Sequence, residues 1–314
     1  MLTRRHIRVK VMQSVYAFNQ SSETNLDKEE KFLSVSMENM YNLYLVLLNL
    51  MVSIHIMAEQ HLTVSSKKYL ATEEEKNPNR KFIDNLVLKK LRNNTALQEE
   101  IKQRKLIDWD LENEYVKIIY NAIKDSEVYA IYMRSGKQDF KEDRDFLEQV
   151  FKEYIATNDK LYDFIEDSRL TWIDDLPLVN TLILKILRKT KPTTVDSWFL
   201  PSLFKDEEDR NFAVKLFRKT ILKSEQLQKE ITGRTPNWDL ERITEVDAIL
   251  LKMAICEFKE FPSIPIKVTI NEYLEIAKEY STPKSSIFIN GILDKLVKEY
   301  QSENTLNKTG RGLM

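Results

Sequence analysis

Glycine and proline are scarce in this chain, and that scarcity constrains its fold more than any other feature. The 314 residues include only 5 glycines and 8 prolines, whereas average proteins contain about 7% glycine and about 5% proline. Turn-rich β-sandwiches and parallel α/β folds with glycine loops are therefore disfavoured. Apolar residues recur at helical spacing in nearly every segment, for example at Ile7, Val11 and Val15. The sequence predicts an all-α protein with about two domains.

Charge and cysteine content exclude several classes of protein. The 48 basic and 49 acidic side chains nearly cancel, which excludes an acidic disordered tail and a uniformly basic coat for nucleic acid. The lone Cys256 cannot form an internal disulfide or supply a zinc site, so a reducing cytoplasm fits best. His55 and His61 are six residues apart, which is off the i, i+4 face of a helical metal pair. We expect no metal, no other cofactor and no enzyme activity.

One apolar segment, residues 43–58, approaches the character of a membrane span. It is about 16 residues long, whereas a bilayer requires about 20, and polar residues interrupt it. We predict a buried helix there and no membrane association. The N-terminus is basic but lacks the apolar run of a secretory signal.

A pattern of about 65 residues occurs twice in the chain. The first copy comprises Asp143, Phe146, Phe151, Ile155, Leu161, Ile165 and Trp172; the second, 66 residues later, comprises Asp209, Phe212, Phe217, Ile221, Leu227, Ile231 and Trp238. A fainter third copy lies upstream and ends at Trp109. Each copy is typical of a helix, a tryptophan-bearing turn and a second helix, so stacked copies would bury a continuous core. The alternative is that similar amphipathic helices simply look alike.

The first predicted helix is strongly basic at its N-terminus. Thr3 is a suitable N-cap, and Arg4, Arg5 and Arg8 follow it, with no acid before Glu23. Positive charge at a helix N-terminus opposes the helix dipole and costs some tenths of a kcal/mol per residue. The three arginines share one helix face, and phosphates are the natural partners for such a cluster. The alternative is a merely solvated basic end.

The C-terminal third contains three predicted helix starts. Thr244 and Thr269 each precede an acid by three residues, as in a capping box, and Pro283 is suited to the first helical position. Gly291 lies inside an apolar stripe, where a glycine costs about 1 kcal/mol. It therefore predicts the close approach of another helix.

Motifs at both ends resemble the NusB family of transcription antitermination proteins. The opening motif is Arg4-Arg5-x-x-Arg8 followed by Gln13-Ser14-Val15-Tyr16, and the C-terminal motifs are Ile264-Pro265-x-Lys267-Val268-x-Ile270-Asn271-Glu272, Glu275-x-Ala277-Lys278 and Phe288-Ile289-Asn290-Gly291-Ile292-Leu293-Asp294-Lys295. The resemblance covers residues 3–18 and 209–299. It implies a NusB-like helical bundle with inserted, partly duplicated helical repeats. The implied segments are N-terminal helices over 1–62, an inserted segment over 63–208, a C-terminal core over 209–300 and a flexible tail over 301–314.

The resemblance also implies a function. Members of this family pair with NusE, a small-subunit ribosomal protein, and bind the single-stranded boxA element of ribosomal RNA leader transcripts. They thereby help the RNA polymerase elongation complex to read through terminators, and homodimers are plausible. The resemblance assigns RNA contacts to Arg4, Arg5, Arg8, Gln13, Lys284 and Phe288, and NusE contacts to Tyr16 and Asp247. Lys284 would substitute for a lysine that the family usually carries about one turn away.

Two other functions compete with this one. In the first, the inserted repeats form a protein-interaction scaffold and the NusB-like ends are structural. In the second, the chain is an RNA-modifying enzyme, which is disfavoured because it lacks a glycine-rich cofactor loop and an α/β half. Removal of the first-helix arginines separates RNA binding from the scaffold, because only RNA binding depends on them.

Overall fold

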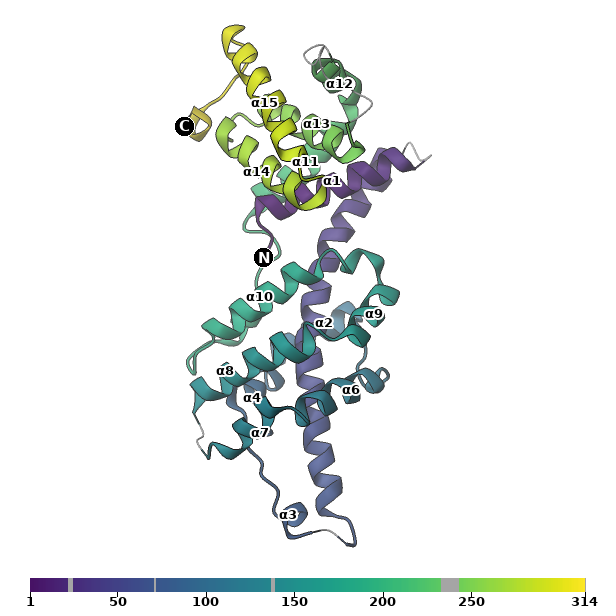
Figure 1. Cartoon of the computed structure of the whole chain (residues 1–314), viewed down its shortest axis with the longest axis vertical. Coiled ribbons are helices and arrows are strands. Elements are labelled where there is room, and N and C mark those ends of the chain that lie inside the picture. The colour runs from purple at the N-terminus through teal and green to yellow at the C-terminus, as the bar shows by residue number, and fades with distance from the viewer. Residues whose placement is uncertain (22–24, 71, 137–138, 233–242, 314) are drawn as a thin grey trace. The chain divides into compact units, whose positions relative to one another are not determined.

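The computed structural model describes residues 1–21, 25–70, 72–136, 139–232 and 243–313, and these residues form helices and no strand. The chain divides into two compact units (Figure 1). The terminal unit comprises Leu2–Met37 and Leu203–Met314, and the middle unit comprises Glu38–Ser202 together with Met1. These boundaries differ from the predicted 62/63 and 208/209, and both 37/38 and 62/63 lie inside helix α2 (Leu26–Ser66).

The terminal unit is built around one buried helix, α13 (Glu245–Glu260), whose residues from Ile249 to Phe258 are all buried except Lys252. Its neighbours are α1 (Arg4–Gln20), α11 (Glu207–Leu222), α12 (Ser224–Thr232), α14 (Ile266–Tyr280) and α15 (Ser285–Ser302). The predicted N-caps are confirmed at Thr3 and Thr244, whose side chains accept hydrogen bonds from the backbone N–H of His6 and Asp247. Local sequence therefore fixed where α1 and α13 begin.

Three other local predictions in this unit are wrong. Thr269 does not cap a helix, because α14 begins three residues earlier, directly after Pro265. Pro283 is not the first residue of α15, which begins at Ser285. Gly291 is exposed, and a Cβ atom built on it would meet nothing within 4 Å, so no other helix approaches it closely.

The C-terminal tail packs against the turn between α13 and α14, although a flexible tail was predicted. The Thr309 N–H donates to the Pro262 carbonyl at 3.1 Å, and the Lys308 ammonium donates to the Phe261 carbonyl at 3.1 Å. A Cβ atom on Gly312 would lie 1.9 Å from the Pro262 oxygen, so this approach requires glycine. A short 3₁₀ turn, Gly310–Leu313, closes the tail.

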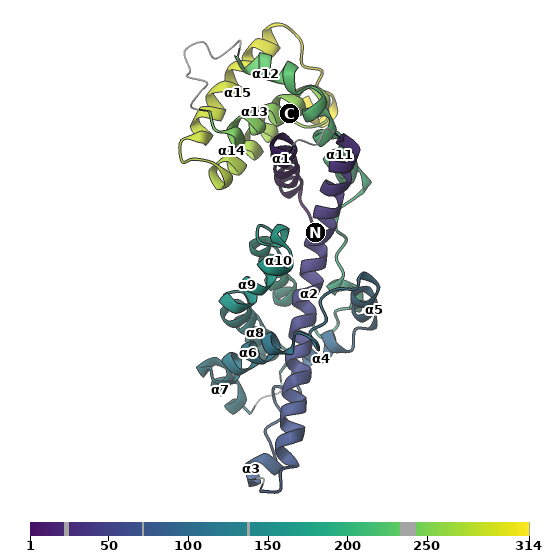
Figure 2. The ribbon, with the colours of Figure 1, turned by 90° about the vertical axis from the view of Figure 1, so that its right-hand side faces the viewer.

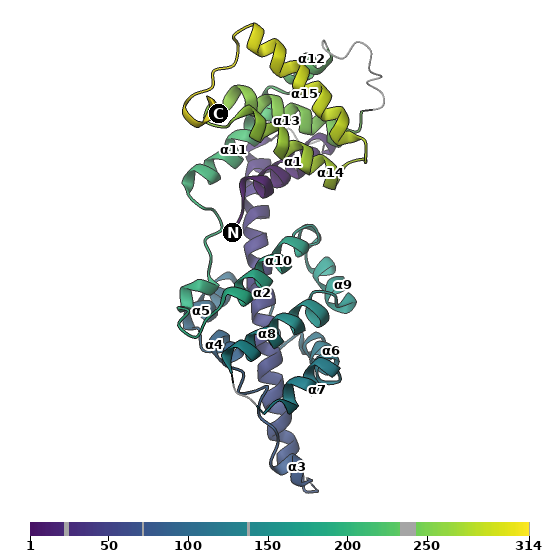
Figure 3. The same cartoon turned by 60° about the vertical axis from the view of Figure 1, so that its left-hand side comes forward.

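The middle unit contains the rest of α2 and a series of shorter helices. These are α3 (Glu73–Lys76), α4 (Leu86–Arg92), α5 (Thr95–Arg104), α6 (Asn113–Lys124), α7 (Glu127–Arg134), α8 (Phe140–Val150), α9 (Asp159–Ser168) and α10 (Leu176–Lys189). A π-helical turn, Phe151–Ile155, extends α8, and 3₁₀ turns occupy Leu170–Trp172 and Asp196–Phe199. Figures 2 and 3 show these helices flanking α2.

Helix α2 is the one described helix long and apolar enough to cross a membrane. Its most apolar stretch is 72% buried inside the protein, which is the character of a core helix. The prediction of a buried helix over residues 43–58 is therefore confirmed.

Two tryptophans anchor the shorter helices to α2. The indole N–H of Trp109 donates to the Val46 carbonyl at 3.0 Å, and that of Trp172 donates to the Asn39 carbonyl at 2.7 Å. The two acceptors are seven residues apart, about two helical turns, so they lie on one face of α2. Trp238, the corresponding residue of the second copy, lies outside the described residues. The order of helix, helix, tryptophan turn and helix recurs over 86–124 and 140–189, while duplication itself stays a prediction.

Candidate functional site

The arginines of α1 face carboxylates of the same chain. Arg8 is the innermost: its Nε donates to Glu257 Oε2 at 2.8 Å and its Nη2 donates to Glu257 Oε1 at 2.7 Å. The exposed fractions of the two side chains are only 2% and 0%. A pair so enclosed must satisfy its own hydrogen bonds, because water cannot reach it.

Helix α14 completes the bonding of Glu257. The Thr269 hydroxyl donates to Glu257 Oε1 at 2.7 Å, and the Tyr273 hydroxyl donates to Oε2 at 3.2 Å. Burial lowers the pKa of Arg8, but attraction to Glu257 and hydrogen bonding with it outweigh burial and raise that pKa above its ordinary value. Arg8 therefore stays charged as a structural cation, and its contact with RNA stays a prediction.

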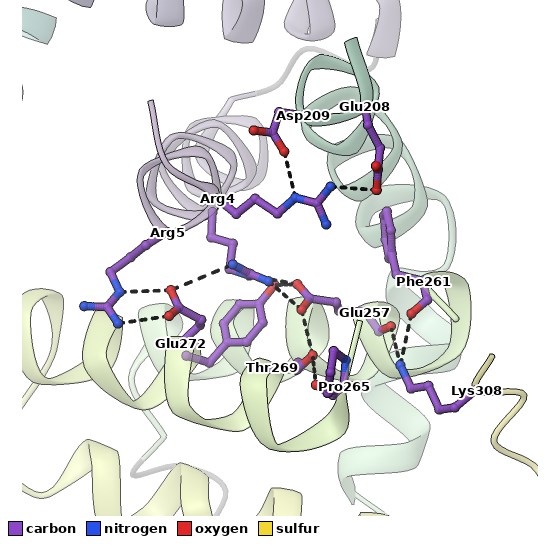
Figure 4. A network of polar contacts seen from close by, with 12 residues as sticks. Arg4, Arg5, Glu208, Asp209, Glu257, Phe261, Pro265, Thr269, Glu272 and Lys308 are labelled. Atoms are coloured by element: carbon purple, nitrogen blue, oxygen red, sulfur yellow. Dashed lines mark hydrogen bonds and ion pairs between the residues drawn. The ribbon is translucent and has the colours of Figure 1, made fainter. Parts of the chain in front are cut away.

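Arg4 and Arg5 lie nearer the surface and also have carboxylate partners (Figure 4). Arg4 donates to Asp209 Oδ1 and Glu208 Oε1, each at 2.7 Å. Arg5 donates to both oxygens of Glu272, at 2.9 and 3.0 Å. The side chains of Arg4 and Arg5 remain 31% and 42% exposed. These carboxylates offset the unfavourable charge at the start of α1, the role that was predicted for phosphate.

A groove of about 920 Å³ runs past these arginines within the terminal unit. Its basic lining includes Arg4, Arg5, Lys205 and Arg311, and its acidic lining includes Glu208 and Glu272. The charge of the groove is therefore mixed rather than uniformly positive. A bound phosphate would have to share or displace a carboxylate, and arginine can present the same fork of donors to either group.

His6 also lines this groove, where it forms part of the helix cap. Its Nδ1 accepts the Thr3 backbone N–H at 3.2 Å, and burial, followed by the charge of Arg5, lowers the pKa of His6. A neutral imidazole accepting at Nδ1 carries its proton on Nε2. His6 therefore adds a hydrogen-bond donor to the groove without adding a charge.

The remaining predicted contact residues lie along α1 and at the start of α15. Tyr16 is 41% exposed, and Gln13, one turn before it, is partly buried. Lys284 is exposed just before α15, and Phe288 is partly buried in its first turn. Because Glu272 precedes the end of α14 by eight residues, about 12 Å of helix separates the Arg5 pair from the turn that carries Lys284.

Asp247, the other residue predicted to contact NusE, is buried within the terminal unit. Its side chain accepts the hydroxyl protons of Ser281, at 2.7 Å, and Ser285, at 2.8 Å, and the residue is only 3% exposed. These bonds join α13 to the turn between α14 and α15. Asp247 therefore has a structural role in the terminal unit, and its contact with NusE stays a prediction.

Sequence reasoning missed the acidic half of this site. The run from Leu250 to Phe258 is apolar except for Lys252 and Glu257. A single acid in such a run indicates that it has a buried, charged partner. Glu272 was interpreted as a capping residue, whereas it binds Arg5. Lys308, which also donates to the Glu257 backbone carbonyl, gave no local signal because it lies in the polar tail.

These features define the terminal unit as an all-helical domain whose basic first helix is held by acidic residues on α11, α13 and α14. The model of the NusB family matches residues 193–298. The chain belongs to the NusB family, because it is 42% identical over 112 residues to the transcription antitermination protein NusB of Salinibacter ruber, covering 36% of this chain and 70% of that relative.

Two further relatives give the same result. The transcription antitermination protein NusB of Chloroherpeton thalassium is 38% identical over 129 residues, or 41% of this chain and 61% of the relative. The transcription antitermination protein NusB of Koribacter versatilis is 43% identical over 98 residues, which are 31% of this chain and 67% of that relative. No solved structure matches this chain. Most of the middle unit precedes the matched family residues and is additional to them.

Proposed function

We propose that this protein is a non-enzymatic RNA-binding antitermination factor of the cytoplasm. Together with NusE it binds boxA-like RNA in ribosomal RNA leader transcripts and promotes read-through by the RNA polymerase elongation complex. The observation that carries the proposal is the 42% identity to a transcription antitermination protein, over 70% of that relative's length. The packing of α1 against α13 and α14, which brings the two family motifs into one unit, supports it.

In this proposal, Arg4 and Arg5 bind RNA phosphates along the groove. Their side chains are partly exposed, and two of their partners, Glu208 and Glu272, are also partly exposed. Asp209 is buried, so Arg4 keeps that bond and shares its guanidinium between Asp209 and a phosphate. Gln13 and Lys284 add polar contacts, and Phe288 stacks on an unpaired base. Tyr16, whose ring is exposed on α1, contacts NusE.

Fluorescence anisotropy of a boxA-like RNA, with and without NusE and over a salt series, tests the proposal. An Arg4→Ala/Arg5→Ala variant should weaken binding and reduce the log–log salt slope by about 1.4, at about 0.7 per single-strand phosphate. Arg218→Ala is the matched control, since Arg218 is similarly exposed and also binds two acids, Asp27 and Glu30. NusE-independent binding, or equal slopes for the variant and the control, would refute the proposal.

A second candidate function is a protein-interaction scaffold in the middle unit. It is favoured by one observation, that this unit is compact by itself and lies mostly outside the family match. For a scaffold, the Arg4→Ala/Arg5→Ala variant should retain every protein partner that the native chain captures. Loss of those partners together with RNA would exclude it.

A further inference from the structure

The end of α10 carries an unusual concentration of positive charge. Between Asp175 and Asp196 the chain has four basic residues and no acid. They are Lys185, Arg188, Lys189 and Lys191. A helix C-terminus favours positive charge in its last turn, which accounts for Arg188 and Lys189. Lys191 lies beyond the helix, so the dipole does not explain it.

A lysine from a different helix joins this cluster. Lys90, on α4, donates from its ammonium to the Pro192 carbonyl at 3.2 Å, which places it beside the turn that carries Lys191. A carbonyl partner leaves the charge of Lys90 uncompensated. The folding of the middle unit therefore adds a distant cation to a segment that is already basic.

Other basic residues on α4 and α10 have carboxylate partners among the described residues, unlike Lys90 and Lys191. Lys89 pairs with Asp84, Arg92 pairs with Glu59, and Arg188 pairs with Glu148. Within the part of the chain that the structure describes, no carboxylate lies within ion-pair distance of Lys90, Lys185, Lys189 or Lys191. Lys185, Lys189 and Lys191 are exposed and Lys90 is partly exposed, while Asp196 is the next acid along the chain.

An aromatic ring lies at the same place. The indole N–H of Trp198 donates to the carbonyl of Ile186, on the last turn of α10, at 3.4 Å, while 39% of the residue remains exposed. The other two described tryptophans, Trp109 and Trp172, are buried. Trp198 is therefore a partly exposed ring tethered to the last turn of α10, the turn that also carries Lys189.

We propose that Lys90, Lys189, Lys191 and Trp198 form a binding site for single-stranded RNA on the middle unit. Lysine ammoniums contact successive phosphates, and the indole stacks on an unpaired base, which is the combination used for single strands without sequence preference. Neither double-stranded nucleic acid nor an acidic protein surface offers a free base to the ring. The site is separate from the arginine groove and does not depend on NusE.

A 20-nucleotide oligo(U) RNA, which lacks a boxA element, tests this site in the full chain. Anisotropy is measured in the Arg4→Ala/Arg5→Ala background, so that the groove contributes little. Adding Lys90→Ala, Lys189→Ala and Lys191→Ala should weaken binding and flatten the salt slope by about 2, for three lost phosphate contacts. An unchanged affinity and slope would overturn the proposal.

The matched control removes three exposed lysines elsewhere in the middle unit: Lys117, Lys152 and Lys160. It changes the net charge equally, so a pure net-charge effect would appear in both triple variants and would overturn the proposal. Poly-glutamate is the competitor. Equal displacement of oligo(U) by poly-glutamate and by unlabelled RNA would identify a general anion patch and would also overturn it.

Trp198 provides an independent readout. Oligo(U) should quench tryptophan fluorescence of the native chain, and Trp198→Phe should remove that quenching while the fold is kept. Trp198→Ala should weaken binding about 5-fold or more, the low end of base–aromatic stacking. If Trp198→Ala fails to fold, fluorescence of the Trp198→Phe variant tests the proposal alone. Quenching by oligo(U) that persists in Trp198→Phe would contradict the proposal.

The two RNA proposals fail in different ways. If the native chain binds oligo(U) but shows no NusE-dependent binding of boxA-like RNA, the antitermination function fails and the middle-unit site stands. If boxA-like RNA binds with NusE while the lysine triple variant leaves oligo(U) binding unchanged, the middle-unit site fails alone.

Discussion

Arg8 and Glu257 face each other through two hydrogen bonds at the centre of the terminal unit, although 249 residues separate them in the chain. The pair joins the first helix of the protein to the central helix of the C-terminal segment. Thr269 and Tyr273 bind the same carboxylate, so three helices meet at one ion pair. The family motif Arg-Arg-x-x-Arg therefore has an outer part that can meet a ligand and an inner part that holds the fold.

Arg8→Ala should destabilise the terminal unit severely. It leaves the Glu257 carboxylate buried without its cation, a change that typically costs about 3–5 kcal/mol. Arg5→Ala, which breaks a half-exposed pair, should cost at most about 1 kcal/mol. Urea unfolding followed by circular dichroism measures both, and similar losses for the two variants would contradict the structural role of Arg8.

Gly312→Ala should release the C-terminal tail. A Cβ atom there would lie 1.9 Å from the Pro262 carbonyl oxygen, so the tail must move away from the α13–α14 turn. The Thr309 N–H, which donates to the same carbonyl, should then exchange faster with solvent, as hydrogen exchange can measure. Gly291→Ala is the matched control, expected to stabilise α15 by about 1 kcal/mol because its Cβ meets open space.

Asp247→Ala should act on stability rather than on partner affinity alone. The substitution removes the acceptor of two serine hydroxyls, and hydrogen bonds to charged groups contribute about 1.5–3 kcal/mol each. We expect a lower unfolding midpoint in urea, with NusE affinity falling only as far as the folded fraction falls. A stable variant that has lost NusE binding would instead assign Asp247 a direct contact with NusE.

His55 should make the protein less stable as the pH falls below neutral. Its Nε2–H donates to the Ile83 carbonyl at 2.7 Å, and burial lowers the pKa of the ring below 6.5. A group whose pKa is depressed on folding adds stability above its unfolded pKa, and this stability declines as the pH falls toward the folded value. Unfolding measured at pH 7 and pH 5 should therefore show a smaller loss for His55→Gln. An equal or larger loss in the variant would contradict this account.

Helix caps could be predicted from the local sequence, whereas ion pairs between residues far apart in the chain could not. Thr3 and Thr244 correctly predicted the starts of α1 and α13, because the side chain of an N-cap residue accepts a hydrogen bond from a backbone N–H in the next turn. Arg8 showed its charge but not its partner, since no periodicity links residue 8 to residue 257. Thr269 shows how local patterns compete: Pro265 starts α14 one turn earlier, and the hydroxyl is then free to bind Glu257.

The predicted close approach of another helix to Gly291 was wrong because the local pattern does not show which neighbours a residue faces. A glycine inside an apolar stripe signals that a backbone can approach, but the stripe does not say which side the glycine faces. It lies on the exposed side of α15. Gly312, in the polar tail, is the glycine that meets another backbone closely, and no apolar pattern surrounds it to announce this.

The two tryptophan anchors on α2 limit how the length of this helix can change during evolution. Val46 and Asn39 present their carbonyls on one face because seven residues make nearly two whole turns. Inserting a single residue between them would rotate one carbonyl by about 100° relative to the other, and one indole would lose its acceptor. Relatives that keep both anchors should therefore differ in this stretch by whole turns, in steps of three, four or seven residues.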